Sequence, residues 1–151
     1  VNPFEAYIAK DKSRADEAYS QYDDLNGAYN IDNYDYRDIA FANYVNVNFA
    51  LASPPVNGDV FVTGAFTNWN LTDENKMRYD TAQSIYTSRV LLKQGWYDYQ
   101  YVVRSKELPY HHFEGSHFET ENYYEIFVYH KPYQPRADLL IGYLRVEKNP
   151  R

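Results

Sequence analysis

Residues 111–121 concentrate the side chains that could do chemistry. Histidine nitrogens and carboxylate oxygens are ligands for zinc and other divalent ions. If the segment were a strand, side chains two residues apart would share one face. No His-Glu-x-x-His motif is present, however, and Gly115 interrupts any helix. We interpret the segment as a solvated edge strand or loop and expect neither a metal nor a cofactor there. Its candidate ligands are His111, His112, Glu114, His117, Glu119 and Glu121.

Acidic residues suggest two further sites. Glu119 and Glu121 on one strand would have Cα atoms about 6.5–7 Å apart, which is compatible with the carboxylate pairs of glycoside hydrolases. Any exposed pair of acids on a strand meets this condition, so the pair indicates little. A second acidic group invites a calcium site, but its spacing does not fit the twelve-residue helix–loop–helix pattern. We interpret that group as a solvated loop with Asx turns: Asp23, Asp24, Asp32, Asn33, Asp35 and Asp38.

The sequence contains no arrangement of residues that is typical of nucleophilic catalysis. The chain has no cysteine, so it has neither a thiol nucleophile nor a disulfide. It has no Gly-x-Ser-x-Gly elbow, phosphate-binding loop or dinucleotide fingerprint. Ser84, Ser88 and Ser105 have no arguable His–Asp partner. The sequence therefore predicts a protein that is not an enzyme.

Charge and composition exclude other classes. The formal net charge is −6 and the basic residues are scattered, whereas a nucleic-acid reader carries a basic face. No apolar run approaches the ~20 residues of a transmembrane helix. The 151 residues include 2 Trp, 18 Tyr and 8 Phe, and aromatic side chains favour strands. We expect an all-β protein that binds no nucleic acid and has no transmembrane segment.

Turn residues divide the chain into seven to nine short strands, the pattern of an immunoglobulin-like β-sandwich. Residues 1–40 are predicted to be a strand-and-loop extension that packs on or tethers a sandwich of residues 41–151. Strands at 44–51 and from Gly58 onward are expected to form an antiparallel hairpin. The strands are expected in residues 3–9, 28–31, 44–51, 59–62, 85–92, 96–103, 122–130 and 139–146.

Two aromatic stretches supply the candidate binding residues. Phe66, Asn68 and Trp69 follow a strand that breaks at Gly64, and Phe66 is assigned to the core. In residues 96–103, Tyr97, Tyr99, Tyr101 and Val103 alternate with Trp96, Asp98 and Gln100. The tyrosine side is expected to face the core. An exposed Trp96 beside Asp98 and Gln100 is then a candidate contact patch.

Residues 60–101 resemble the early-set immunoglobulin-like domains that bind α-glucans. Those domains carry a V-x-V-x-G-x-F-N-x-W strand and loop, matched here by Val60 to Trp69, and a glycine-led strand matched from Gly95 to Tyr101. The resemblance implies the same fold and an α-glucan as an alternative partner. Trp69 matches the first sugar-stacking tryptophan. The sugar-contacting lysine falls on Gln100, and the second stacking tryptophan has no match near Glu107.

A resemblance over most of the chain is to the C-terminal half of the type IX secretion system plug proteins. It is carried by five blocks in one order: 22–27, 59–69, 91–103, 114–122 and 138–143. It implies an exported protein at the periplasmic side of the outer membrane of a Gram-negative cell. Its partner would be the outer-membrane translocon barrel, whose pore it closes. The family's N-terminal half has no counterpart here.

Overall fold

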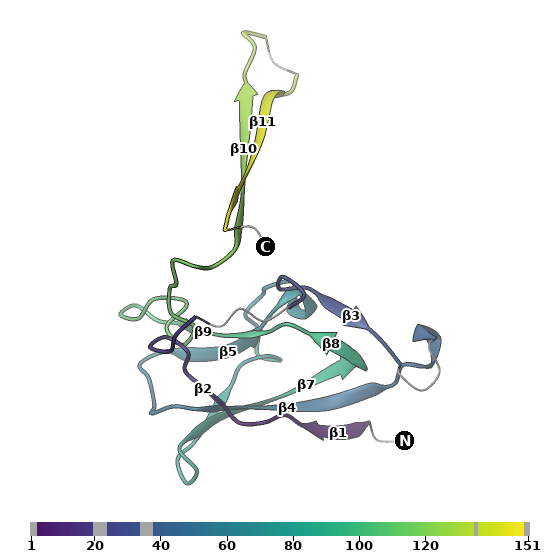
Figure 1. Ribbon diagram of the computed structural model, residues 1–151, viewed down its shortest axis with the longest axis vertical. Coiled ribbons are helices and arrows are strands. Elements are labelled where there is room, and N and C mark those ends of the chain that lie inside the picture. The colour runs from purple at the N-terminus through teal and green to yellow at the C-terminus, as the bar shows by residue number, and fades with distance from the viewer. Residues whose placement is uncertain (1–2, 20–23, 34–37, 135, 150–151) are drawn as a thin grey trace. The chain divides into compact units, whose positions relative to one another are not determined.

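The computed structural model describes residues 3–19, 24–33, 38–134 and 136–149, which form eleven strands and two short 3-10 helices (Figure 1). The chain is therefore all-β, as predicted. It divides into two compact units, Val1–Gly115 and Ser116–Arg151. The sequence placed a boundary after residue 40 instead. The difference arises because the first three strands pair with later strands of the first unit.

The first unit is built on β4 (Tyr44–Ala52), where alternation of apolar and polar residues predicted a strand. All nine residues of β4 pair antiparallel with β7 (Ile85–Lys93), and β7 also pairs with β6 (Arg78–Asp80). The other edge of β4 is taken by two parallel strands, β1 (Phe4–Tyr7) and β2 (Asp11–Lys12). The sheet order is β1-β4-β7-β6, with β2 beside β4.

Two antiparallel pairs complete this unit. They are β5 (Asp59–Thr63) with β9 (Gln100–Arg104), and β3 (Tyr29–Ile31) with β8 (Gly95–Tyr97). The predicted hairpin of β4 with β5 is therefore wrong. Both edges of β4 are already occupied, and residues 53–58 include Pro54 and Pro55. That connection is too long for a two-residue hairpin turn, so β5 pairs elsewhere.

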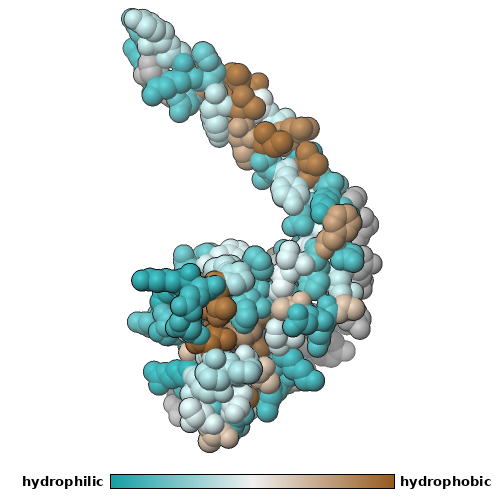
Figure 2. Space-filling model, turned by 90° about the vertical axis from the view of Figure 1, so that its left-hand side faces the viewer, coloured by the Kyte–Doolittle hydropathy of each residue, from teal (hydrophilic) through white to brown (hydrophobic). Residues whose placement is uncertain are grey.

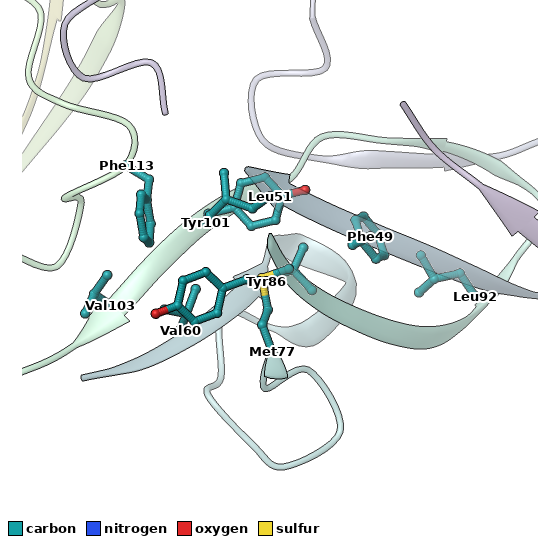
Figure 3. Close-up of a cluster of buried hydrophobic side chains, with 10 residues drawn as sticks. Phe49, Leu51, Val60, Met77, Tyr86, Leu92, Tyr101, Val103 and Phe113 are labelled. Atoms are coloured by element: carbon teal, nitrogen blue, oxygen red, sulfur yellow. The ribbon is translucent and has the colours of Figure 1, made fainter. Parts of the chain in front are cut away.

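The core lies between the large sheet and the β5–β9 pair (Figure 3). Phe49 and Leu51 of β4 pack with Val60 and Val62 of β5, and all four are at most 2% exposed. The predicted core residues Val47, Tyr97 and Tyr99 are partly buried against this cluster, and Val45 is also partly buried. The buried members are Phe49, Leu51, Val60, Val62, Met77, Tyr86, Leu92, Tyr101, Val103 and Phe113.

Polar contacts tie the N-terminal strands to the rest of the unit. The Asp11 carboxylate accepts hydrogen bonds from the hydroxyls of Tyr99 (2.9 Å) and Tyr101 (2.6 Å). The backbone N–H of Arg14 donates to the carbonyl of Phe113 at 2.7 Å. The Glu5 carboxylate accepts from Asn46 and Asn48 and pairs with Arg89. These bonds hold parallel strands that are too short to be held by pairing alone.

The second unit is a β-hairpin. Strands β10 (Asn122–His130) and β11 (Leu139–Lys148) pair antiparallel along their whole length. Their register shifts between Val128 and Tyr129, where Ile141 is an extra residue on β11. Both strands lie where strands were predicted, although β11 continues two residues beyond the predicted end, and Pro132 lies in the connecting loop.

Candidate functional site

The first candidate surface is the aromatic loop after β5. Its 3-10 helix, Ala65–Thr67, is preceded by Gly64 as the N-cap. Asn68 and Trp69 then take φ values of +50° and +60°, a left-handed conformation that is strained for a bulky residue. The N–H groups of Thr67 and Trp69 both donate to the Gly64 carbonyl, at 3.0 and 3.1 Å. This turn leaves the Trp69 side chain 47% exposed.

Phe66 turns inward from the same loop. Its ring stacks with Phe49 at a centroid distance of 6.5 Å and meets Tyr97 edge to face at 5.7 Å. Phe66 is partly buried against the core, which is the role predicted for it. It therefore supports the loop from beneath.

Asp98 anchors a neighbouring turn. Its carboxylate accepts hydrogen bonds from the N–H groups of Leu25 (2.8 Å) and Gly27 (2.9 Å). Gly27 has a φ of +78°, and a Cβ built on it would lie 3.2 Å from the Trp69 indole. The turn thus packs on Trp69, and Asp98 holds it there.

The remaining candidate residues lie apart from this arrangement. Trp96 pairs with Asn30 across β8 and β3 and is 67% exposed, as expected. It alternates with Tyr97, whose ring stacks on Tyr29 at 5.3 Å. Gln100, the first residue of β9, pairs with Thr63 of β5. Since β8 ends at Tyr97 and β9 begins at Gln100, the expected shared face of Trp96, Asp98 and Gln100 is interrupted.

The histidine and carboxylate segment is used for packing. The Glu114 carboxylate accepts from the Tyr101 N–H at 2.9 Å and from Arg14 at 2.6 Å. The ring of His112 lies 5.0 Å from that of Phe113. Among the residues that the structure describes, no group of three or more His, Asp or Glu side chains could hold a metal ion. Asp23 and Asp35 of the acidic loop lie outside those residues.

A polar depression lies at the end of the β5–β9 pair. Asp59 of its lining pairs with Arg104 at 2.8 Å and, outside the lining, with Lys76 at 2.7 Å. Glu107 accepts a hydrogen bond from the Asn57 side chain at 2.9 Å. The Lys76 hydrogen bond, followed by that of Arg104, lowers the pKa of Asp59. These ion pairs stabilise the end of the sheet. The depression is lined by Asn57, Gly58, Asp59, Arg104, Ser105, Lys106 and Glu107.

The hairpin carries a second candidate surface, the apolar hairpin face. Side chains two apart on a strand and cross-strand partners share a face, and the register pairs Tyr124 with Val146 and Ile126 with Leu144. Figure 2 shows hydrophobic side chains along the hairpin. The five members of the face are between 43% and 56% exposed: Tyr124, Ile126, Val128, Leu144 and Val146.

The opposite face of the hairpin differs in its contacts. The Tyr143 hydroxyl donates to Glu125 at 2.6 Å, and the Arg145 guanidinium lies 4.2 Å from the centre of the Tyr123 ring. Arg145 also pairs with Glu147 at 3.4 Å. These polar groups are therefore paired within the face, which also exposes the rings of Phe127 and Tyr129. The apolar hairpin face has no comparable set of polar side chains.

Sequence reasoning missed the apolar hairpin face as a surface. It treated residues 122–130 as an ordinary strand of the sandwich. A signal was present, because Tyr123, Phe127 and Tyr129 make the second side of β10 aromatic as well. The residues that the structure describes include no helix long and apolar enough to cross a bilayer.

Comparison with solved structures identifies a crystal structure that this chain resembles. The chain is similar to a hypothetical protein from Parabacteroides merdae ATCC 43184, known from a crystal structure at 2.30 Å resolution. The match has a TM-score of 0.86 and 33% sequence identity over 98% of this chain. The chain spans 39% of the length of that protein. Comparison with protein-family models and with curated proteins gave no match.

Proposed function

We propose that the chain is a non-catalytic interaction domain that docks on a protein partner through the apolar hairpin face. The observation that carries the proposal is the exposure of five apolar side chains on one side of a two-stranded hairpin. A contiguous exposed apolar patch is typical of an interaction site. A two-stranded hairpin is also marginally stable by itself in water, so a partner that covers this face would stabilise it.

The sequence resemblance supplies the partner and the place. It supports an early-set immunoglobulin-like sandwich for the first unit and membership of the type IX secretion system plug proteins. The proposed partner is then the outer-membrane translocon barrel, approached from the periplasmic side in a Gram-negative cell. Among the carboxylates considered as metal ligands, Glu114 accepts hydrogen bonds from Tyr101 and Arg14, which agrees with a structural role.

The test is recovery of the barrel from outer membranes with the full-length protein. The matched variants are Ile126→Lys on the apolar hairpin face and Phe127→Lys on the opposite face, at positions 49% and 48% exposed. We expect the unaltered protein and Phe127→Lys to recover the barrel subunit, identified by mass spectrometry, and Ile126→Lys to lose it. Recovery by Ile126→Lys at the level of the unaltered protein, or no recovery in any case, would contradict the proposal.

Carbohydrate binding is the second candidate function. The observation that favours it is the left-handed backbone of Asn68 and Trp69, which holds an exposed indole in place; backbone strain of this kind clusters at functional sites. The test is binding to a panel of soluble α-glucans, with Trp69→Ala as the control. Saturable binding that Trp69→Ala abolishes would support this function over docking.

A further inference from the structure

Strand β10 has an unpaired backbone edge. Within the part of the chain that the structure describes, β10 and β11 form a sheet of two strands only. In an antiparallel pair, every second residue turns its N–H and C=O toward the partner strand and the others turn theirs outward. The nine residues of β10 include no proline, so its outward row of donors and acceptors is unbroken. Such a row is a template for another strand.

The two edges of the hairpin are not equivalent. Strand β11 carries the extra residue Ile141 at the register shift, and Arg145 and Lys148 near its end. Bulges and basic side chains are devices that protect an edge from pairing. Strand β10 has neither device, and Glu125 is its one acidic or basic residue besides His130. The open edge of the hairpin is therefore that of β10.

We propose, on the basis of the proposed function, that β10 accepts a β-strand of the docking partner as a third strand of the hairpin sheet. The row of backbone groups selects an extended strand, because only a strand presents matching donors and acceptors at the same spacing. On the apolar hairpin face, the partner strand places apolar residues beside Tyr124, Ile126 and Val128. On the opposite face it places a neutral or basic residue beside Glu125, since like charges across strands are destabilising.

Two other occupants fit less well. Packing this face against the same face of a second copy would cover the apolar side chains but would leave the outward backbone groups of β10 unpaired. A lipid surface would cover the side chains but could not satisfy the backbone groups of β10.

The test is amide hydrogen exchange of the full chain, read residue by residue by NMR, with two separate probes. One probe is the purified barrel subunit. The other is a seven-residue peptide, acetyl-Thr-Val-Thr-Val-Lys-Val-Thr-amide, with a control peptide in which proline replaces the second and fourth residues. With at least one of these probes we expect slowed exchange at alternate residues of β10, no change at the outer edge of β11, and no effect of the control peptide.

The two probes separate the two proposals. If the peptide protects β10 but the barrel does not bind, the result would contradict the proposed function and still support the strand site. If the barrel binds but does not slow exchange at alternate residues of β10, the result would contradict the strand site and still support docking. Three results would contradict the strand site. They are equal protection of β10 and β11, protection that increases with the concentration of the chain in the absence of a probe, and no protection with either probe.

A matched pair of variants tests which edge is used. Ile126 and Leu144 are cross-strand partners on one face, but only Ile126 would lie next to an added strand. We expect Ile126→Lys to weaken peptide binding about fivefold and Leu144→Lys to weaken it less than about twofold. The amide hydrogen exchange rates of the cross-strand partners Tyr124 and Val146 report whether each variant keeps the hairpin. Equal losses from two intact hairpins would contradict addition at β10.

Discussion

At the scale of single residues, we expect alanine substitutions at two glycines to differ in their effect on stability. A Cβ on Gly64 would lie 2.6 Å from the Asp98 carbonyl oxygen and 2.8 Å from the Phe66 ring. The first of these contacts is with backbone, which cannot rotate away. We expect Gly64→Ala to lower the free energy of unfolding of the first unit by about 1–3 kcal/mol, measured by chemical denaturation.

Gly142 is the matched control for that substitution. A Cβ there would lie 3.4 Å from the Val128 Cβ, which is ordinary van der Waals contact. Gly142 lies in the second unit, so Gly142→Ala controls for the replacement of glycine by alanine and should leave the unfolding midpoint of the first unit unchanged. A Gly64→Ala variant as stable as Gly142→Ala would show that the loop and Asp98 are not in close contact.

The tyrosines bonded to Asp11 predict a loss of stability in alkaline solution. Burial, and then the hydrogen bond to Asp11, raise the pKa of both Tyr99 and Tyr101 above the ordinary 10.0. The unfolded chain therefore releases these protons at a lower pH than the folded chain does. Stability is fully present below pH 10 and falls above it, by about 1.4 kcal/mol per pH unit for each tyrosine.

Chemical denaturation at intervals from pH 8 to 11.5 measures this loss. Tyr99→Phe keeps the ring and removes one titrating hydroxyl, so it should make the decline above pH 10 shallower. An equally steep decline in that variant would show that Tyr99 ionises normally in the folded protein.

Residue roles were predictable where they depend on local pattern. The alternation around residue 97 assigned the tyrosines to the core, and Phe66 was predicted to be the aromatic ring of its loop that packs inward. The role of Asp98 was not predictable, because its carboxylate binds the N–H of Gly27, 71 residues away in sequence. Nothing in the neighbourhood of either residue marks the other.

At the scale of elements, β1 is held to the large sheet by its pairing with β4 and by the contacts of the Glu5 carboxylate. Arg89, and then Asn48, lower the pKa of Glu5 to about 2 from an ordinary 4.5. Its contribution to stability is therefore present above pH 4.5 and is lost as the pH falls toward 2. We expect β1 to detach from β4 over that range, and amide exchange of Ala6 and Tyr7, corrected for intrinsic rates, to accelerate between pH 5 and pH 2.5.

The control is Glu5→Gln, which keeps an oxygen that can accept hydrogen bonds but cannot titrate. In that variant the corrected exchange of β1 should be faster at pH 5 and change little on acidification. Acid-induced release of β1 in Glu5→Gln equal to that in the unaltered chain would assign the effect to another group.

Strand positions were predictable from alternation, but strand pairing was not. The strands β4 and β7 lie where period-two patterns placed them, and β10 and β11 lie where strands were predicted between turn residues. The order of strands in the sheet depends on contacts distant in sequence. The parallel pairing of β1 with β4 joins Phe4 to Val45, and no local turn signal can encode such a pairing.

At the scale of the whole molecule, the two compact units differ in how their apolar side chains are used. All ten buried members of the core cluster lie between Phe49 and Phe113, within the first unit. The hairpin of the second unit instead has exposed apolar side chains on β10 and β11. Sequence composition could not distinguish the buried side chains from the exposed ones, since Tyr, Ile, Val and Phe occur in both units.

This division predicts that the first unit folds without the second. A chain that ends at Gly115 retains every buried member of the core cluster and all strands from β1 to β9. We expect it to unfold cooperatively, with a Tm within about 4 °C of that of the first unit in the full chain. The complementary peptide of residues 116–151 should show no cooperative transition, because a lone two-stranded hairpin is marginally stable.

Near-ultraviolet circular dichroism follows the first unit through its buried tyrosines. A shortened chain that fails to fold, or that melts more than about 10 °C lower, would show that the hairpin supplies stability that the core cluster alone does not account for.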